Sequence, residues 1–292
     1  NQIFIGEYMS DLNLIKELRE KSGAGFLDCK NALKENNNDI DQSIETLRKK
    51  GLAKATKKSS REAKEGAVAF YNNDNMSVVL KINSETDFSA KSDTFLDFVD
   101  KLGNLALDTN DKNLNLNTFM EYTENGKKIS DILNEMIAKI GENILISEIK
   151  TFDVTNLNLN YYIHNPYRKN IGKIVSSVFF SCDDNNDEIK TFSKNLCMHI
   201  AASKPEAMDI DQLPKEAIDN ETKIQREIIL DSGKPSNVME KILEGKMKKF
   251  YSEVTLLNQN FVVDTDKTVR EAIDNFNSSN KFNFLNFSLT SL

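Results

Sequence analysis

Apolar residues recur at helical spacing through residues 12–50 and predict three short amphipathic helices there. Gly23 and Gly25 separate the first two helices, because both are free to take positive φ in a tight turn. Asp39 is a candidate cap for the third helix, and Gly51, which follows a basic last turn, is predicted to end it. The residues that share the predicted buried faces are Leu14, Ile15, Leu18, Ile40, Ile44 and Leu47. Three such helices predict a small bundle, which buries little surface alone.

From residue 67 onward the spacing changes to alternation, which is typical of strands. Apolar residues over 67–71 and 78–82, with a turn of asparagine and aspartate between them, predict a β-hairpin. A helix follows, with Phe95, Phe98, Val99 and Leu102 on its apolar face.

The polar stretch 108–125 is predicted to be a loop, and 129–140 a helix that Gly141 ends. After these elements the order of hairpin and helix repeats. The second hairpin and helix comprise strands over 157–163 and 171–180, a turn over 165–170 and a helix over 189–200. Two hairpin-and-helix units predict two related α+β subdomains packed together.

A pair of helices interrupts the second unit. Pro214 is a tolerated first residue for one helix, which stops at 231–235, a segment with a glycine and a proline. A second helix carries apolar residues over 238–250. Two helices joined by so short a turn form an antiparallel hairpin. Strands resume near 261–263 and 282–287, so the hairpin is predicted to be an insertion.

The predicted fold class is therefore α+β. Residues 1–8 precede an internal methionine and are left out of this argument. The predicted organisation is an N-terminal helical domain over 9–52, a basic and partly helical linker over 53–66, a core N-subdomain over 67–145, and a core C-subdomain over 146–292 with the helical hairpin inserted over 206–254.

The charge balance argues against general nucleic-acid binding. The chain carries 45 acidic and 38 basic side chains, a net charge of -7, whereas a nucleic-acid binder usually shows a basic surplus. The basic run over 54–64 has no interleaved aromatic residue on which a base could stack, so a solvated linker face is the better interpretation. No apolar run approaches the roughly 20 residues of a membrane helix, and no secretory signal pattern occurs.

Residues with catalytic or metal-binding chemistry are sparse. Cys29, Cys182 and Cys197 lie far apart with no metal-binding spacing, so we expect no disulfide scaffold, no zinc site and a reducing compartment. Cys29 is expected to be a buried small apolar residue. No glycine-rich phosphate loop occurs, and no nucleophile lies at motif spacing from a base. We therefore expect no catalytic centre, no metal, no cofactor and no directly bound nucleotide.

Five segments of the chain together resemble the elongation factor Ts family of bacterial and organellar translation. A short motif such as threonine-aspartate-phenylalanine is weak alone, but these segments follow the family's order and cover nearly the whole chain. The segments are LIKELREKSGAGFLDCKNAL at 14–33, NSETDFSAKSDTF at 83–95, IAKIGENI at 137–144, HIAASKPEAM at 199–208, and SGKPSNVMEKILEGKMKKFYSEVTLLNQNFV at 232–262.

The resemblance implies both a fold and a function. The fold would have an N-terminal UBA-like three-helix bundle, two related core subdomains, and an inserted coiled-coil hairpin. The function would be guanine-nucleotide exchange in protein biosynthesis, without a catalytic centre of its own. The implied partner is elongation factor Tu, in its GDP-bound and nucleotide-free states, with no direct contact to nucleic acid or membrane. The expected compartment is the bacterial cytoplasm, with the organellar matrix or stroma left open.

The central motif carries the implied exchange activity. By resemblance, Thr86, Asp87, Phe88 and Ser89 dislocate Mg²⁺ from the partner, with the ring of Phe88 wedged between partner helices. Asp87 is not expected to bind the ion. From spacing alone, Phe88 would more often be a core residue, because apolar side chains are mostly inside.

Other partner contacts are implied outside this motif. Arg19, Phe26 and Leu27 match positions through which the N-terminal domain grips the partner, although the bundle core is expected to take at least one of Phe26 and Leu27. His164 is implied to contact the partner near its phosphate-binding loop, with a surface turn histidine as an equal alternative. His199 is expected to pack on a helix face near the core.

A scaffold or binding protein that does not exchange nucleotide is the alternative function. Such a protein would use the bundle to bind peptides and the helical hairpin as a dimerisation arm. The threonine-aspartate-phenylalanine segment separates the two hypotheses, because a scaffold would not need it.

Overall fold

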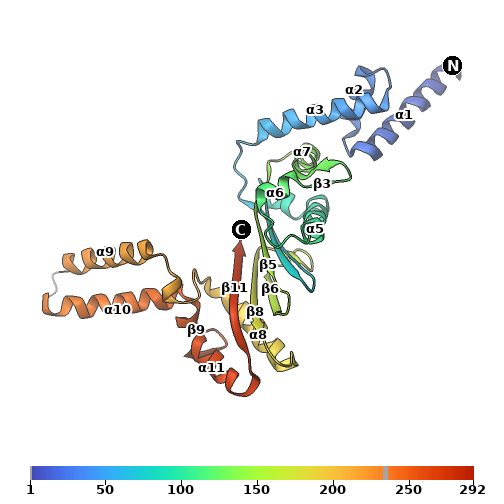
Figure 1. Ribbon diagram of the computed structural model, residues 1–292. Helices are drawn as coiled ribbons and strands as arrows, with labels where there is room; N and C mark the ends of the chain where they lie inside the picture. The colour runs from blue at the N-terminus through green and yellow to red at the C-terminus, as the bar shows by residue number, and fades with distance from the viewer. Residues whose placement is uncertain (1, 233–235) are drawn as a thin grey trace. The chain divides into compact units, whose positions relative to one another are not determined.

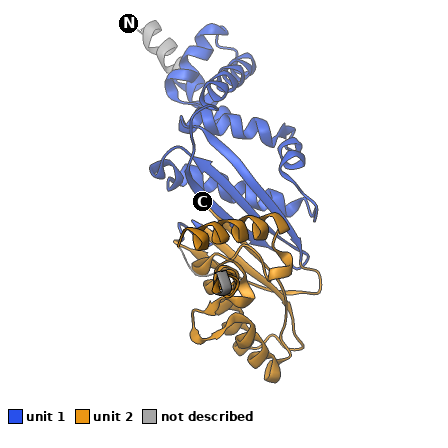
Figure 2. Ribbon diagram, turned by 90° about the vertical axis from the view of Figure 1, so that its left-hand side faces the viewer, with its two compact units in different colours: residues 1–153, 166–173, 292 blue, residues 154–165, 174–291 orange. Residues whose placement is uncertain are grey.

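The computed structural model describes residues 2–232 and 236–292, and it has mixed helices and antiparallel sheets, as the α+β prediction requires (Figure 1). The chain divides into two compact units (Figure 2). Unit 1 comprises residues up to 153 together with 166–173 and Leu292, and unit 2 comprises 154–165 and 174–291. Among the described residues, no helix combines the length and the apolar character needed to cross a membrane.

Unit 1 begins with the three predicted helices, which are α1 (Gln2–Ser22), α2 (Phe26–Glu35) and α3 (Ile40–Lys58) (Figure 1). They share a small core of buried residues formed by Ile15, Leu18, Cys29, Ala32 and Leu33. Asp39 caps α3 as predicted, because its side chain accepts a hydrogen bond from the Gln42 amide at 2.8 Å. Gly23 takes a positive φ of 67°, whereas Gly25 is extended with a φ of −65°.

The prediction that Gly51 ends the third helix is wrong, because α3 continues to Lys58. The absence of a Cβ at Gly51 has a packing role instead. Gly51 is buried, and a Cβ built on it would lie 3.4 Å from the Cβ of Ala138 on α7 (Ile129–Ile140). The glycine therefore lets α3 and α7 approach closely, and an ion pair of 2.6 Å between Arg48 and Asp131 joins the same two helices.

The sheet of unit 1 has the strand order β5-β2-β1-β7, with every neighbouring pair antiparallel. The predicted hairpin is confirmed by β1 and β2, and α7 ends at Gly141 as predicted. The strand β5 is not among the predicted elements. The elements are β1 (Glu65–Asn72), β2 (Met76–Ser84), β5 (Ile144–Asp153), β7 (Ile171–Gly172) and the helix α5 (Asp93–Asp108). Helices α5 and α7 pack on this sheet over the largest apolar core of the described chain.

The stretch 108–125 is not the simple loop that its polarity predicts. It contains α6 (Leu116–Glu121), and β3 (Thr123–Glu124) pairs with β4 (Lys127–Lys128). The α6 helix begins with a capping box at Asn115, and its Phe119 is fully buried. One buried aromatic is enough to dock a single short helix, but it leaves no periodic pattern to detect in the sequence.

Unit 2 contains a second antiparallel sheet of order β11-β8-β6, and β9 pairs with β10 in a small ladder. Its elements are β6 (Asn158–His164), β8 (Ile174–Ser181), α8 (Asp187–Ser203), β9 (Asn260–Phe261), β10 (Asp264–Thr268), α11 (Val269–Asn280) and β11 (Asn283–Ser291). The core is rich in aromatic rings, and Phe192 stacks on Phe276 of α11 with ring centroids 4.0 Å apart. The α11 helix is not predicted from the apolar spacing, although Thr268 and Glu271 form a capping box at its start.

The helical insertion consists of α9 (Lys215–Asp231) and α10 (Ser236–Val254), which lie side by side in Figure 1. They confirm the two predicted helices. Their shared core includes Ile229, Leu243 and Met247. Pro214 stands at the cap of α9, one residue before the helix. The predicted glycine-proline turn falls largely on 233–235, outside the described residues.

Candidate functional site

The threonine-aspartate-phenylalanine motif forms a tight turn directly after β2. Thr86 caps the short helix α4 (Asp87–Ala90), because its hydroxyl accepts a hydrogen bond from the Ser89 amide at 3.2 Å. The side chain of Phe88 projects from this helix and is 85% exposed. The expectation from spacing, that Phe88 belongs to the core, is therefore wrong, and the exposed position implied by the resemblance is observed.

The Asp87 carboxylate and the Ser89 carbonyl, on either side of Phe88, form hydrogen bonds within this segment, whereas the buried Ser89 hydroxyl has no hydrogen-bond partner among the described residues. Asp87 pairs with Lys91 at 2.9 Å, and this hydrogen bond and charge lower the pKa of Asp87 below its usual value. Ser89 is buried, and its carbonyl accepts a hydrogen bond from the Ser92 hydroxyl at 2.8 Å. The exposed ring of Phe88 therefore lies beside a carboxylate that stays ionised at neutral pH.

A residue without a predicted role also belongs to this turn. The carboxylate of Glu142 accepts hydrogen bonds from the Thr86 hydroxyl at 2.7 Å and from the Thr86 amide at 3.1 Å. The two residues are 56 positions apart, so no local pattern could reveal the contact. The only available signal was that Glu142 falls in IAKIGENI at 137–144, one of the five matching segments.

The N-terminal bundle presents an apolar patch to solvent. Phe26 is 46% and Leu27 is 66% exposed at the start of α2, and Arg19 is exposed on α1. The expectation that the bundle core takes at least one of Phe26 and Leu27 is therefore wrong. The core is filled from α2 by Cys29, Ala32 and Leu33, and the two residues of its first turn, Phe26 and Leu27, lie outside it.

The two histidines differ in environment, and both lie in unit 2. His164 is the last residue of β6, opposite Ile174, and its Nδ1 lies 3.2 Å from the hydroxyl of Tyr162. His199 is fully buried on α8, which confirms the expected packing role. Phe88 and the patch at Phe26 belong to unit 1.

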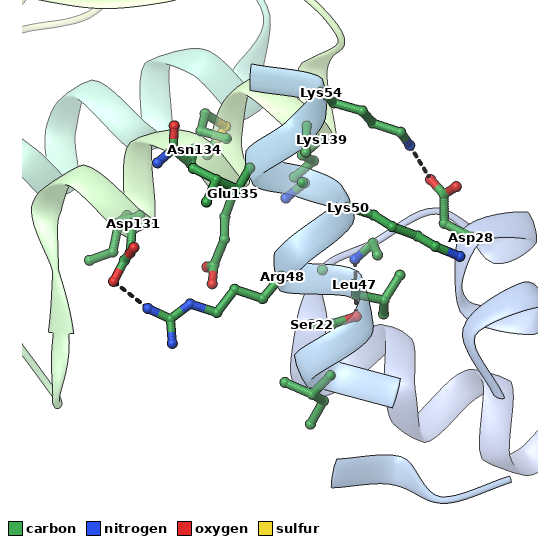
Figure 3. A pocket seen from close by; sticks show the side chains of 18 of the residues that line it. Ser22, Asp28, Leu47, Arg48, Lys50, Lys54, Asp131, Asn134, Glu135 and Lys139 are labelled. Atoms are coloured by element: carbon green, nitrogen blue, oxygen red, sulfur yellow. Dashed lines mark hydrogen bonds and ion pairs between the residues drawn. The ribbon is translucent and has the colours of Figure 1, made fainter. Parts of the chain in front are cut away.

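Unit 1 also contains a hollow of about 840 Å³ that is lined mainly by residues of the bundle, α5 and α7 (Figure 3). Ion pairs connect its walls. Lys54 of α3 bonds Asp28 of α2 at 3.1 Å, and Arg48 of α3 bonds Asp131 of α7, as the dashed lines in Figure 3 mark. The Lys54–Asp28 pair lies within the bundle, whereas the Arg48–Asp131 pair and the Gly51 contact attach the bundle to α7.

Comparisons with known proteins agree with the resemblance. The family model described as "Elongation factor TS" matches residues 85–291. The elongation factor Ts of Allorhizobium ampelinum is 39% identical over 260 residues, which cover 89% of this chain and 84% of the relative. That of Ehrlichia ruminantium (strain Welgevonden) is 40% identical over 263 residues, 90% of this chain and 91% of the relative. That of Magnetococcus marinus is 37% identical over 262 residues, 90% of this chain and 85% of the relative.

Proposed function

The chain belongs to the elongation factor Ts family, and on this premise we propose that it binds elongation factor Tu in its GDP-bound state and accelerates release of the GDP. It is a translation elongation factor that acts as a guanine-nucleotide exchange factor. The chemistry of exchange belongs to the partner's nucleotide site, so this chain needs only a surface that disturbs that site.

The exposure of Phe88 carries the proposed mechanism. An 85% exposed phenylalanine is unfavourable in water, and its turn has no other apolar group at the surface. Inserted between helices of the partner, the ring would move the loop that holds Mg²⁺. The ion and the backbone amides around it hold the phosphates of GDP, so losing the ion leaves phosphate charge poorly compensated and GDP leaves faster.

The same coupling must operate in both directions. If this chain weakens GDP binding, GDP weakens the binding of this chain by the same factor. The nucleotide-free partner is therefore the form that binds most tightly, and a new nucleotide releases the factor.

Other surfaces of the chain would supply further contacts with the partner. We assign partner contacts to Arg19, Phe26 and Leu27 on a UBA-like bundle over 9–52, since large exposed apolar groups beside an arginine are typical interface anchors. His164 is a further proposed contact. The pair α9 and α10 would form the coiled-coil hairpin, and the bacterial cytoplasm would be the place of action. No contact with nucleic acid or membrane is required.

Stopped-flow release of fluorescent GDP from bacterial elongation factor Tu tests the proposal. Wild-type protein should accelerate release many-fold, and Phe88→Ala should reduce that acceleration by roughly tenfold or more, as expected for a central interface aromatic. The control is Tyr122→Ala, which removes another exposed aromatic ring of unit 1 and should act like wild type.

Each outcome has a distinct meaning. If wild type and Phe88→Ala accelerate release equally, exchange stands and the wedge is wrong. If the complex forms while the release rate stays unchanged, the chain is a scaffold or binding protein.

A further inference from the structure

Two loops meet at the end of the β2–β5 strand pair. Ser84 pairs with Ile144 as the last register position. Beyond that pair, the chain from β2 continues into Glu85 and Thr86, while Glu142 and Asn143 lead into β5. The loop that carries Phe88 therefore lies beside a segment that arrives from α7.

Each loop uses an acidic side chain to hold the backbone of the other. Glu142 accepts hydrogen bonds from both the hydroxyl and the amide of Thr86, at 2.7 and 3.1 Å. In return, the carboxylate of Glu85 accepts a hydrogen bond from the amide of Asn143 at 2.6 Å. Hydrogen bonds to a charged acceptor are about twice as strong as neutral ones, so the reciprocal pair resists sliding of either loop.

From this geometry we infer that Glu142 is a positioning residue for Phe88 in nucleotide exchange, an inference that rests on the proposed function. The Thr86 hydroxyl donates its single proton to Glu142, which leaves its lone pairs for the Ser89 amide. Glu142 thereby orients the group that caps α4. A helix of four residues cannot hold its own conformation, so the direction of the Phe88 ring depends on this cap.

Glu142 is itself well anchored. Gly141 ends α7 in the left-handed region with a φ of 87°, which turns the chain sharply toward β5. The Gly141 carbonyl accepts a hydrogen bond from the Lys58 ammonium group at the end of α3. Asn143 is 1% exposed, and its side-chain amide donates to the carbonyl of Arg61 at 2.6 Å. Glu142 therefore connects the fixed end of α7 to the turn that carries Phe88.

The sequence of this chain allows a direct measurement of ring order in the free protein. The chain has no tryptophan, so Phe88→Trp places a single tryptophan at the proposed wedge, and excitation at the red edge of its absorption avoids the tyrosines. Adding Glu142→Ala to this variant should increase the amplitude of fast motion in time-resolved fluorescence anisotropy. The matched control is Glu135→Ala, which removes an equal charge from α7, where Glu135 pairs with Lys127 at 2.7 Å and, among the described residues, forms no hydrogen bond or ion pair with the Phe88 turn. It should leave the anisotropy decay unchanged.

The same substitutions in the Phe88 protein test exchange itself. Glu142→Ala should slow stimulated GDP release roughly tenfold, the equivalent of one lost charge-assisted hydrogen bond, and Glu135→Ala should act like wild type. Glu142→Gln keeps one acceptor oxygen for the Thr86 hydroxyl and should recover part of the rate. Thr86→Ser, which retains the hydroxyl, should exchange faster than Thr86→Val, which loses it. This pair keeps the test valid if Glu142→Ala fails to fold.

The outcomes separate the inference from the proposed function. Slower exchange together with a more mobile ring supports the positioning role. If wild type accelerates GDP release and Glu142→Ala and Thr86→Val accelerate it equally, the positioning role is overturned and exchange stands. The same conclusion follows if the ring in Phe88→Trp is as ordered with Glu142→Ala as without it. If wild type itself fails to accelerate release, the proposed function fails and the positioning role falls with it.

Discussion

Phe88 and Phe95 show how strongly the environment of one residue depends on its neighbours. They are seven residues apart, which in one continuous helix would place them on the same face. Yet Phe88 is 85% exposed and Phe95 is fully buried. The chain changes direction between them, because α4 ends at Ala90 and Ser92 starts α5 by accepting a hydrogen bond from the Phe95 amide. The Thr86 cap of α4 and the Ser92 cap of α5 therefore separate an exposed ring from a core ring.

His199 leads to a prediction about pH. Its Nδ1 accepts a hydrogen bond from the Val262 amide at 3.2 Å, so the proton lies on Nε2, 2.9 Å from the side-chain oxygen of Gln259. Burial lowers the pKa of His199 below 6.5. The neutral ring thus stabilises the fold above the unfolded-state pKa of 6.5, and this stability is lost as pH falls through the folded-state pKa.

Urea unfolding at pH 7.5 and 5.5 measures this effect. In a His164→Gln background, His199 is the only histidine, and the free energy of unfolding should fall between these values by up to about 1.4 kcal/mol per pH unit. Adding His199→Asn should lower stability at pH 7.5 and flatten the dependence between the two pH values. An unchanged slope would show that another group titrates.

At the scale of elements, α5 approaches β1 more closely than an ordinary helix and strand. Gly103 of α5 lies against the ring of Tyr71 on β1, and a Cβ built on Gly103 would lie 2.0 Å from that ring. The Tyr71 hydroxyl donates to Asp100, and burial raises the pKa of Tyr71. Asp100 also accepts a hydrogen bond from Arg168 at 3.3 Å, so one helix holds both the sheet and the 166–173 segment of unit 1.

Gly103→Ala should therefore destabilise the protein. The ring of Tyr71 or the helix must move to make room, at a cost of about 2 kcal/mol, typical of an overpacked core. Gly245→Ala on α10 is the matched control, because no atom lies within 4 Å of the added methyl group. It should stabilise by about 0.5–1 kcal/mol through helix propensity. Equal and small effects in urea unfolding would contradict the close packing.

At the scale of the whole molecule, the described chain has several separate apolar cores instead of one. The core between α9 and α10 is self-contained. The chain enters and leaves this pair through adjacent segments, since Ala207 bridges Thr255, and the Glu206 amide donates to the Val254 carbonyl at 2.8 Å. An insertion whose ends already touch can be removed without stretching the remaining chain.

Replacing residues 211–252 with a flexible linker of about eight residues should leave unit 2 folded. Circular dichroism should show a loss of helix in proportion to the excised residues, with a cooperative thermal transition close to that of wild type. Replacing 270–279 of α11 in the same way is the contrast, because Ala272 and Ile273 belong to the core of unit 2. That variant should unfold or aggregate. Similar behaviour of both variants would refute the independence of the hairpin.

Local patterns accounted for much of this protein. Alternation over 67–71 and 78–82 predicted the β1–β2 hairpin, and helical spacing predicted α1, α2, α5, α7, α9 and α10. Such elements depend on side chains a few positions apart, so their apolar spacing is visible in the sequence. Apolar periodicity does not predict a structure that depends on the packing of a single residue. The basic turn before Gly51 predicts a helix end, and the polarity around Phe119 predicts a loop, yet each residue packs against a partner far along the chain.

The order and spacing of residues therefore determine the α+β class and identify the family. They do not determine which side chains face solvent. Phe88 is exposed, Phe26 and Leu27 lie outside the bundle core, and Glu142 bonds a threonine 56 positions away. Each of these facts depends on which distant segment packs against the residue, and that packing exists only when the chain is folded.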